Sequence, residues 1–349
     1  MKHKTITVFA QLCNLLPRTI LIDIARKYKK NGDGRRFNAV KFNEWDLLIA
    51  LLFGHGARCT SLRGIEDGLA SVQDELHHIQ RAQFICRSTF SYLNNRTDYK
   101  VFEEYYHALV KLFEDQLGKR LPSSFQKPIF SLDSTTITTC LSLFPWAKYR
   151  STKGGFKLHT VLNHDIQMPT VSDLSEGKVA DVTQAKKVIY ALPANSYIVM
   201  DRGYNDYALF AWLTDRGTSF VTRLKDNALT TPLAKRHIAS QKDLWGVYSF
   251  EFQGFAAEVC KGKTFHLVQW HDVENQRWFN FITNDLSLSA ADVAELYRQR
   301  WRIELFFKKL KQNFNVHNFV GRSQNAVMNQ IGNSYLLLRR FLNIWTVGF

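Results

Sequence analysis

Paired cysteines and long apolar runs are both missing from the sequence. The chain has only five cysteines in 349 residues, an odd number, and no two of them form a Cys-x-x-Cys pair. This pattern argues against a disulfide framework and against a zinc ribbon. No apolar run approaches the length of a membrane span, and the first residues lack the apolar region and the cleavage site that are typical of a signal peptide. We therefore expect a protein of the reducing cytoplasm with no membrane partner.

Acidic residues are also in short supply. The chain has 31 Asp and Glu against 46 Lys and Arg, a net charge of +15. The excess favours a polyanionic partner such as DNA, and the alternative is a charge that only keeps the protein soluble. Hydrophobic residues make up 45% of the chain, enough for a large core, and the length predicts two or three domains.

Residues 1–120 have a helical periodicity and predict an all-helical N-terminal domain. Gly54 and Gly56 are expected to end the most apolar of its helices. The predicted helices are 6–16, 18–28, 43–53, 62–69, 88–94 and 99–117, with a basic loop at 27–36 and a domain boundary at 121–124.

Residues 87–96 are the predicted DNA-reading element of this domain. Together with the helix at 62–69 they would form a helix-turn-helix, in which 87–96 is the recognition helix. A helical bundle with a polar loop is the alternative. The face able to contact phosphates and base edges consists of Ser88, Thr89, Ser91, Tyr92, Asn94, Asn95 and Arg96.

From residue 125 onward, β-branched and apolar runs replace the helical pattern. Asp133 lies within the first of these runs, and Asp201 directly follows the short, continuously apolar fourth one. This order predicts an α/β domain over 125–345. The predicted strands are 128–140, 156–162, 168–174, 197–200 and 219–224, with helices at 181–192, 204–216 and 325–341.

Residues 226–286 are too many for a loop inside a compact domain and predict a small β insertion. Trp270 and Trp278 lie in it, and each is either a binding residue or part of the insertion's own core. The predicted strands are 247–252, 256–260, 264–270 and 277–283.

Residues 289–314 predict a long amphipathic helix that Ser289 caps. At about 100° per residue, one narrow polar edge collects four side chains beside the apolar face. They are Tyr297, Arg300, Glu304 and Lys311. A carboxylate flanked by cations and a phenol suits a metal site beside a phosphate-rich ligand, whereas an ordinary ion pair between Arg300 and Glu304 is the alternative.

The spacing Tyr-x2-Arg-x3-Glu-x6-Lys resembles the signature of the bacterial DDE transposases of the insertion-sequence IS-four family. The sequence of residues 298–307, Arg-Gln-Arg-Trp-Arg-Ile-Glu-Leu-Phe-Phe, is also similar to the corresponding segment of that family. Asp133-Ser-Thr and Asp201-Arg-Gly-Tyr resemble its two aspartate blocks. The resemblance implies a ribonuclease-H-like catalytic domain, with a β-strand insertion before the last catalytic helix and an all-helical DNA-binding domain in front.

The resemblance also implies a chemistry. Asp133, Asp201 and Glu304 would be the catalytic residues and the metal ligands. Hard carboxylate oxygens select Mg²⁺ or Mn²⁺, and two ions per active site would support in-line phosphoryl transfer.

DNA phosphates beside this site would be contacted by the cationic and phenolic residues of the last helix. The residues implied are Tyr297, Arg300, Lys308 and Lys311, and weaker candidates are Lys153, Lys157, Arg202 and Lys225. In some relatives an aromatic residue of the insertion holds a flipped base, a role open here to Trp270 or Trp278.

The function implied is cut-and-paste transposition, with nicking of the DNA end, hairpin formation and strand transfer. The partners would be double-stranded DNA, as terminal inverted repeats and target, and a second copy of the chain in a synaptic homodimer. The protein would act in the bacterial cytoplasm, bound to the nucleoid. The alternatives are a truncated, inactive derivative that only binds DNA, and a nuclease of the same fold.

Overall fold

The computed structural model describes residues 7–28, 42–117, 125–140, 142–147, 154–236, 244–272, 276–313 and 319–346. It divides into two compact units. The first unit comprises residues 1–119, 139–146 and 308–349, and the second comprises residues 120–138 and 147–307. The predicted basic loop at 27–36, apart from Lys27 and Tyr28, and the predicted boundary at 121–124 lie outside the described residues.

The first unit is helical, as the periodicity predicts. Local capping explains where two of its helices begin: Asn43 and Asp46 form a capping box, and the Ser61 side chain accepts from the Gly64 backbone. Its elements are α1 Val8–Asn14, α2 Arg18–Lys27, α3 Glu44–Gly56, α4 Leu62–Ser71, the 3₁₀ helix η1 Gln73–His78, α5 Arg87–Arg96, α6 Tyr99–Leu117 and α12 Gln324–Thr346.

The predicted end of helix α3 at Gly54 is wrong. The helix continues to Gly56, and a Cβ atom on Gly54 would lie 2.7 Å from Cδ1 of Ile65. The glycine therefore allows α4 to approach α3 closely, and it does not stop the helix.

The predicted helix-turn-helix is also not formed. Helices α4 and α5 are present, but residues 72–86 and the 3₁₀ helix η1 separate them, whereas that motif needs a turn of about 3–4 residues. Asn94 of the predicted recognition face is buried. Its backbone carbonyl and its Oδ1 accept hydrogen bonds from Nδ2 of Asn329, at 3.0 and 3.2 Å.

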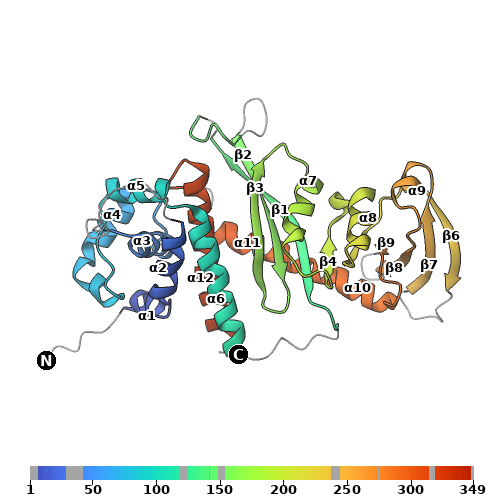
Figure 1. Cartoon of the computed structure of the whole chain (residues 1–349), viewed down its shortest axis with the longest axis horizontal. Coiled ribbons are helices and arrows are strands. Elements are labelled where there is room, and N and C mark those ends of the chain that lie inside the picture. Colours follow the sequence, from blue (N-terminus) through green and yellow to red (C-terminus); the bar gives the residue numbers. More distant parts are fainter. Residues whose placement is uncertain are drawn as a thin grey trace. The chain divides into compact units, whose positions relative to one another are not determined.

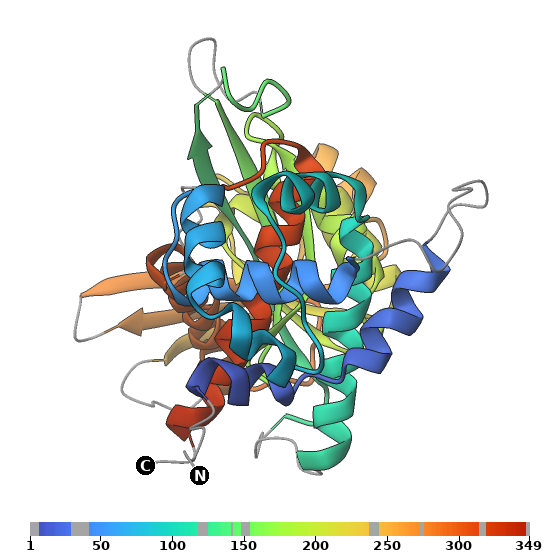
Figure 2. The same ribbon diagram turned by 90° about the vertical axis from the view of Figure 1, so that its left-hand side faces the viewer.

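The C-terminal helix α12 packs inside this first unit, although the predicted catalytic domain extended to residue 345. It contacts α3, α5 and α6, and Figure 2 shows α3 crossing in front of it. Asn325 accepts from the Tyr99 backbone N–H at 2.9 Å and donates to the Thr97 carbonyl at 2.6 Å. These bonds satisfy backbone groups between α5 and α6, so α12 contributes to the packing of the N-terminal helices.

The second unit is built on a nine-stranded sheet with the order β3-β2-β1-β4-β5-β9-β8-β7-β6 (Figure 1). Helices α7 and α8 contribute to the hydrophobic core that includes Phe210 and Phe220, and α10 to the core that includes Val221 and Leu296. The strands are β1 Ile129–Thr139, β2 Gly154–Asn163, β3 Met168–Glu176, β4 Tyr197–Met200, β5 Ser219–Arg223, β6 Thr230–Arg236, β7 Leu244–Phe252, β8 Phe265–Asp272 and β9 Arg277–Thr283. The helices are α7 Asp181–Tyr190, η2 Arg202–Tyr204, α8 Tyr207–Asp215, α9 Phe255–Val259, α10 Ala290–Gln299 and α11 Trp301–Asn313, which runs on into the first unit.

The insertion at 226–286 extends this sheet. Its last strand, β9, pairs antiparallel with β5, so the backbone ladder continues from the central strands to β6. The predicted strand at 256–260 is wrong, because Gly254, at φ 60°, turns the chain into the short helix α9. Strand β6 was not predicted, and its Pro232 is tolerated because β6 lies at the sheet edge.

No single helix of the described residues is both long enough and apolar enough to cross a membrane.

Candidate active site

Strand register places Asp133 and Asp201 side by side. Strands β1 and β4 are parallel, with Leu132 opposite Met200, and each aspartate is the next residue of its chain. The Asp133 carboxylate accepts from the Ser134 backbone N–H at 2.7 Å. The Asp201 carboxylate accepts from the Gly203 backbone N–H at 2.8 Å. Both aspartates therefore lie where β4 ends, beside the middle of β1.

The long helix predicted over 289–314 is interrupted. Ser289 caps α10 with Asp292 as its capping-box partner, but α10 ends at Gln299 and α11 begins at Trp301. The backbone N–H of Arg300 bonds to the carbonyl of Tyr297, and that of Ile303 to the carbonyl of Arg300. These i→i+3 bonds tighten the helix at Arg300. The predicted apolar face is buried: Leu296, Ile303, Phe306, Phe307 and Leu310.

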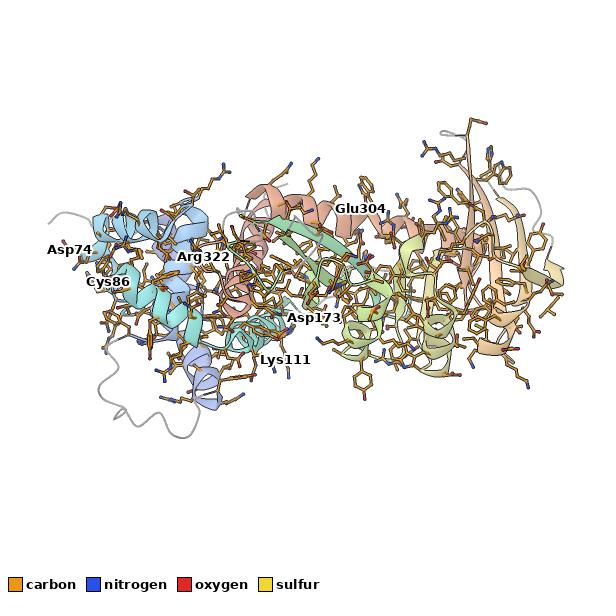
Figure 3. All side chains as sticks on the ribbon, turned by 90° about the horizontal axis from the view of Figure 1, so that it is seen from above. Asp74, Cys86, Lys111, Asp173, Glu304 and Arg322 are labelled. Carbon is orange, nitrogen blue, oxygen red and sulfur yellow. The ribbon has the colours of Figure 1, made fainter. Side chains whose placement is uncertain are left out.

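Arg300 forms ion pairs with a residue of α11 and a residue of β1. Its Nη2 lies 2.6 Å from Oε1 of Glu304, and its Nη1 lies 3.9 Å from Oδ2 of Asp133. Its side chain is only 16% exposed, and its buried Nε has no hydrogen-bond partner among the described residues. The guanidinium also lies over the ring of Tyr297, 5.6 Å from the centroid. Arg300 therefore contacts Tyr297, Glu304 and Asp133. Glu304, labelled in Figure 3, lies in the first turn of α11.

The surroundings of Asp133 and Asp201 raise the pKa values of both carboxyl groups. Burial, together with the nearby charges of Asp201 and Glu304, raises the pKa of Asp133 to about 7 despite the opposing Arg300. Burial also raises the pKa of Asp201, and Asp181 adds to the effect. Burial disfavours a charged carboxylate unless a cation compensates it.

The donor set fits a hard divalent cation, because such ions take carboxylate oxygens and would offset the charge that raises the pKa of Asp133. The acids do not converge on one point. In the part of the chain that the structure describes, no three His, Cys, Asp or Glu side chains stand close enough to hold one ion. Glu304 bonds to Arg300 instead.

The other predicted phosphate contacts have mixed surroundings. Lys308 is exposed, whereas Lys311 is half-buried, and burial lowers the pKa of Lys311. Arg202 pairs with Asp226 at 2.9 Å, and Lys225 Nζ lies 3.4 Å from the carbonyl of Asn205. Lys153 lies outside the described residues.

Lys157 is an ion-pair partner and not a free surface cation. Its Nζ lies 3.1 Å from Oδ1 of Asp181, the first residue of α7. The hydroxyl of Ser134, the neighbour of Asp133, donates to the same oxygen at 2.6 Å. The sequence prediction did not include Asp181. The available signal was an acid at the start of the helix that follows the third strand.

The two tryptophans of the insertion differ. Trp270 packs against the core formed by α10 and the sheet. Trp278 is 48% exposed and stacks on His271, with ring centroids 4.4 Å apart. The exposure of Trp278 makes it the one of the two that can reach a ligand.

The predicted contacts of α5 lie on its surface. Ser88 and Arg96 are exposed and Thr89 is half-buried. The Sγ of Cys86 lies 3.2 Å from the Ser88 hydroxyl and 3.3 Å from that of Thr89, and these hydroxyls lower the pKa of the thiol to about 7. Nη1 of Arg96 donates to the hydroxyl of Tyr92.

The site thus combines an aspartate pair on adjacent parallel strands with an arginine that links Glu304 of α11 to one of the two aspartates. Residues 124–338 match the family model described as a transposase DDE domain, and residues 4–79 match a domain of unknown function. The chain belongs to the transposase DDE domain family. The resemblance drawn from the sequence is thereby confirmed at the level of the family.

Individual relatives carry the same description. The chain is 30% identical to a "Probable transposase for insertion sequence element IS5377" of Geobacillus stearothermophilus, over 62% of this chain and 57% of that protein. It is 27% identical to "Putative transposase y4zB" of Sinorhizobium fredii, over 68% and 65%. It is 25% identical to a "Putative transposase for insertion sequence element IS4SA" of Synechocystis, over 74% and 72%. The chain thus spans less than two thirds of the first two relatives.

Among solved structures, the piggyBac transposase synaptic complex with hairpin DNA matches with a TM-score of 0.46 and 12% identity, over 99% of this chain and 78% of that one. A similarity this low supports no conclusion about this chain.

Proposed function

We propose that this protein is a metal-dependent DNA transposase of an insertion sequence, with a ribonuclease-H-like catalytic unit. One observation carries the proposal: Asp133 and Asp201 lie on adjacent strands, and Arg300 links Glu304 to Asp133. Family membership and the names of three relatives point to the same activity.

In this proposal Asp133, Asp201 and Glu304 hold two Mg²⁺ or Mn²⁺ ions. When bound, such ions activate the attacking oxygen and stabilise the leaving oxygen of an in-line phosphoryl transfer. The protein's own residues supply position and charge. Asp133 and Asp201 are fixed by backbone N–H groups. Glu304 would be free to hold an ion if Arg300, which now bonds to it, bound a DNA phosphate instead.

DNA would be bound at two places. Tyr297, Arg300, Lys308 and Lys311 would contact phosphates beside the acids, because a guanidinium and an ammonium suit phosphate oxygens. In the helical unit, α5 would bind DNA through Ser88, Thr89 and Arg96. The substrates would be the terminal inverted repeats and a target duplex, and two copies of the chain would hold paired ends.

The test is cleavage of labelled DNA that carries the element's own ends, with Mg²⁺, Mn²⁺ or EDTA. We expect metal-dependent cleavage at the end, lost in Glu304→Gln by a factor of about 100 or more. Glu295→Gln is the matched control, since it breaks a comparable helical ion pair, to Arg298 on α10. Hairpin or joined products would distinguish a transposase from a nuclease. Binding without any cleavage by the parent protein would refute the proposed activity and leave a protein that only binds DNA.

A further inference from the structure

A fourth carboxylate, Asp181, is hydrogen-bonded to the residue that follows Asp133. It begins α7 at the turn after β3. The hydroxyl of Ser134 donates to its Oδ1 at 2.6 Å, and Ser134 follows Asp133 in the chain. This hydrogen bond places the carboxylate of Asp181 one residue away from Asp133 along β1.

One oxygen of Asp181 is held and the other is available. Lys157 Nζ lies 3.1 Å from Oδ1 and also donates to the carbonyl of Val179 at 2.9 Å, which fixes the ammonium in place. Within residues 154–236 and the other described ranges, Oδ2 of Asp181 has no hydrogen-bond or ion-pair partner, and its side chain is 31% exposed. A carboxylate in this state can bind a further group without breaking its existing contacts.

Two buried polar groups around Asp181 lack partners. Tyr204 is 1% exposed, and its hydroxyl makes no full hydrogen bond to any described residue, although Ser134 lies beside it. Burial and the charges of Asp133, Asp181 and Asp201 raise its pKa well above the usual range. His159 is completely buried, and its Nδ1 is directed at Oδ1 of Asp181 from 3.9 Å, too far for a hydrogen bond.

The unpaired hydroxyl of Tyr204 points to a missing ligand. A buried donor without a partner costs about 1–3 kcal/mol, so native structures rarely keep one. An ion with its water shell, placed among the carboxylates, would supply oxygen atoms to the Tyr204 hydroxyl. The ordinary alternative, an acid that favours the start of a helix, explains the position of Asp181 but leaves the orphaned Tyr204 unexplained.

We propose that Asp181 is a fourth carboxylate ligand of the divalent-metal site, held in place by the positioning residues Ser134 and Lys157. The inference rests on the proposed function, because it adds a ligand to the site of Asp133, Asp201 and Glu304. A hard divalent cation takes about six or more oxygen ligands, so two ions leave positions that three carboxylates do not fill.

The test is binding of Mn²⁺ alone, measured by electron paramagnetic resonance on the full chain without DNA. Asp181→Asn keeps the shape and the hydrogen bond from Ser134 but removes the charge. We expect its Mn²⁺ affinity to fall by about tenfold or more. The matched control is Asp173→Asn: Asp173 (Figure 3) also pairs with a lysine, Lys187 of α7, but does not contribute to the pKa shifts of Asp133 or Asp201.

The outcomes separate this inference from the proposed function. Weaker Mn²⁺ binding in Asp181→Asn, with Asp173→Asn like the parent, supports the fourth ligand. Parent-like binding in Asp181→Asn, while Glu304→Gln binds weakly, overturns the fourth ligand and leaves the proposed function intact. No binding by the parent refutes the metal dependence and both proposals with it. If circular dichroism shows Asp181→Asn unfolded even in the cold, Asp181→Ser replaces it, because serine also lacks the carboxylate, and unchanged Mn²⁺ affinity there also overturns the inference.

Discussion

The guanidinium of Arg300 lies 2.6 Å from the carboxylate of Glu304, one helical turn away, and 3.9 Å from that of Asp133. An arginine between two acids acts as an internal counter-ion. The same guanidinium can instead bind a phosphate, since its forked donors match either oxygen pair. Binding of DNA would then favour binding of metal. A phosphate bound to Arg300 would free Glu304 and Asp133 to hold the ions.

Arg300→Ala should therefore weaken binding of the element's end in EDTA by about tenfold and reduce the salt dependence of binding by about one phosphate contact. A fluorescence anisotropy titration at several salt concentrations measures both. Arg298→Ala is the control, because Arg298 has a 77% exposed side chain and, among the described residues, its ion pair is with Glu295 alone. Equal losses in the two variants would show that Arg300 contributes general charge and not a specific contact.

The raised pKa of Asp133 makes stability depend on pH. Its ordinary pKa is 3.8 and its folded value is about 7, so between these values the folded protein holds a proton that the unfolded chain releases. The free energy of unfolding should therefore fall as the pH rises from about 4 to about 7, by up to ~4 kcal/mol. His164, whose pKa is lowered by burial to about 4, acts in the opposite direction over much of that window.

The two effects can be separated with Asp133→Asn. Urea denaturation in EDTA at about pH 5 and about pH 8 should show the parent losing more stability than the variant, because His164 is common to both. Addition of Mn²⁺ should restore the parent at the higher pH. A parent and variant with the same pH dependence would contradict the charge imbalance inferred at Asp133.

Alanine substitution of the two tryptophans of the insertion should affect stability to different extents. Trp270→Ala removes a partly buried side chain that packs on the core and should cost about 1–3 kcal/mol of stability. Trp278→Ala removes an exposed ring that stacks on His271 and should cost less than about 1 kcal/mol.

If Trp278 holds an unstacked base, 2-aminopurine at the transposon end should brighten on binding to the parent and much less on binding to Trp278→Ala. Trp301→Ala is the control, since Trp301 is also an exposed tryptophan. An equal signal from all three proteins would exclude Trp278 from this role.

Asn329 ties α12 to the helical unit. Its Nδ2 donates to the Asn94 carbonyl at 3.0 Å and to the Thr97 carbonyl at 3.2 Å, both buried. Asn329→Ala should lower the free energy of unfolding by about 1–3 kcal/mol, because the Asn94 groups lose their best partner. Asn95→Ala, at an exposed neighbouring position, should cost less than about 1 kcal/mol. Urea denaturation followed by circular dichroism compares them, and equal values would contradict the role given to Asn329.

Local chemistry is what the sequence shows well. The apolar run before Asp201 and the cap at Ser289 depend on residues a few positions apart, and β4 and the start of α10 form where these patterns place them. The polar edge of Tyr297, Arg300 and Glu304 was also local, although the helix that carries it is interrupted at Arg300. Strand β1 was predicted for the same reason, from its β-branched run.

Long-range pairing is what the sequence could not show. The join of β5 to β9 and the packing of α12 on α6 connect segments whose own periodicity says nothing about their partners. The contact of Asp181 with Ser134 is of this kind, with 47 positions between them. Short segments also misled: residues 256–260 alternate like a strand, but after Gly254 they form one turn of helix.

The placement of α12 has a consequence for synthesis. Asn325 contacts Asn94 across 231 residues of sequence, so at about 5–20 residues per second the ribosome needs roughly 12–46 s to deliver the partner of helices that emerged long before. Through that interval the helical unit exposes the apolar surface that α12 will cover, while the strands of the second unit are already complete. The nascent chain would therefore acquire its catalytic sheet first and its finished helical unit last, which makes the helical surface the natural place for a chaperone to bind.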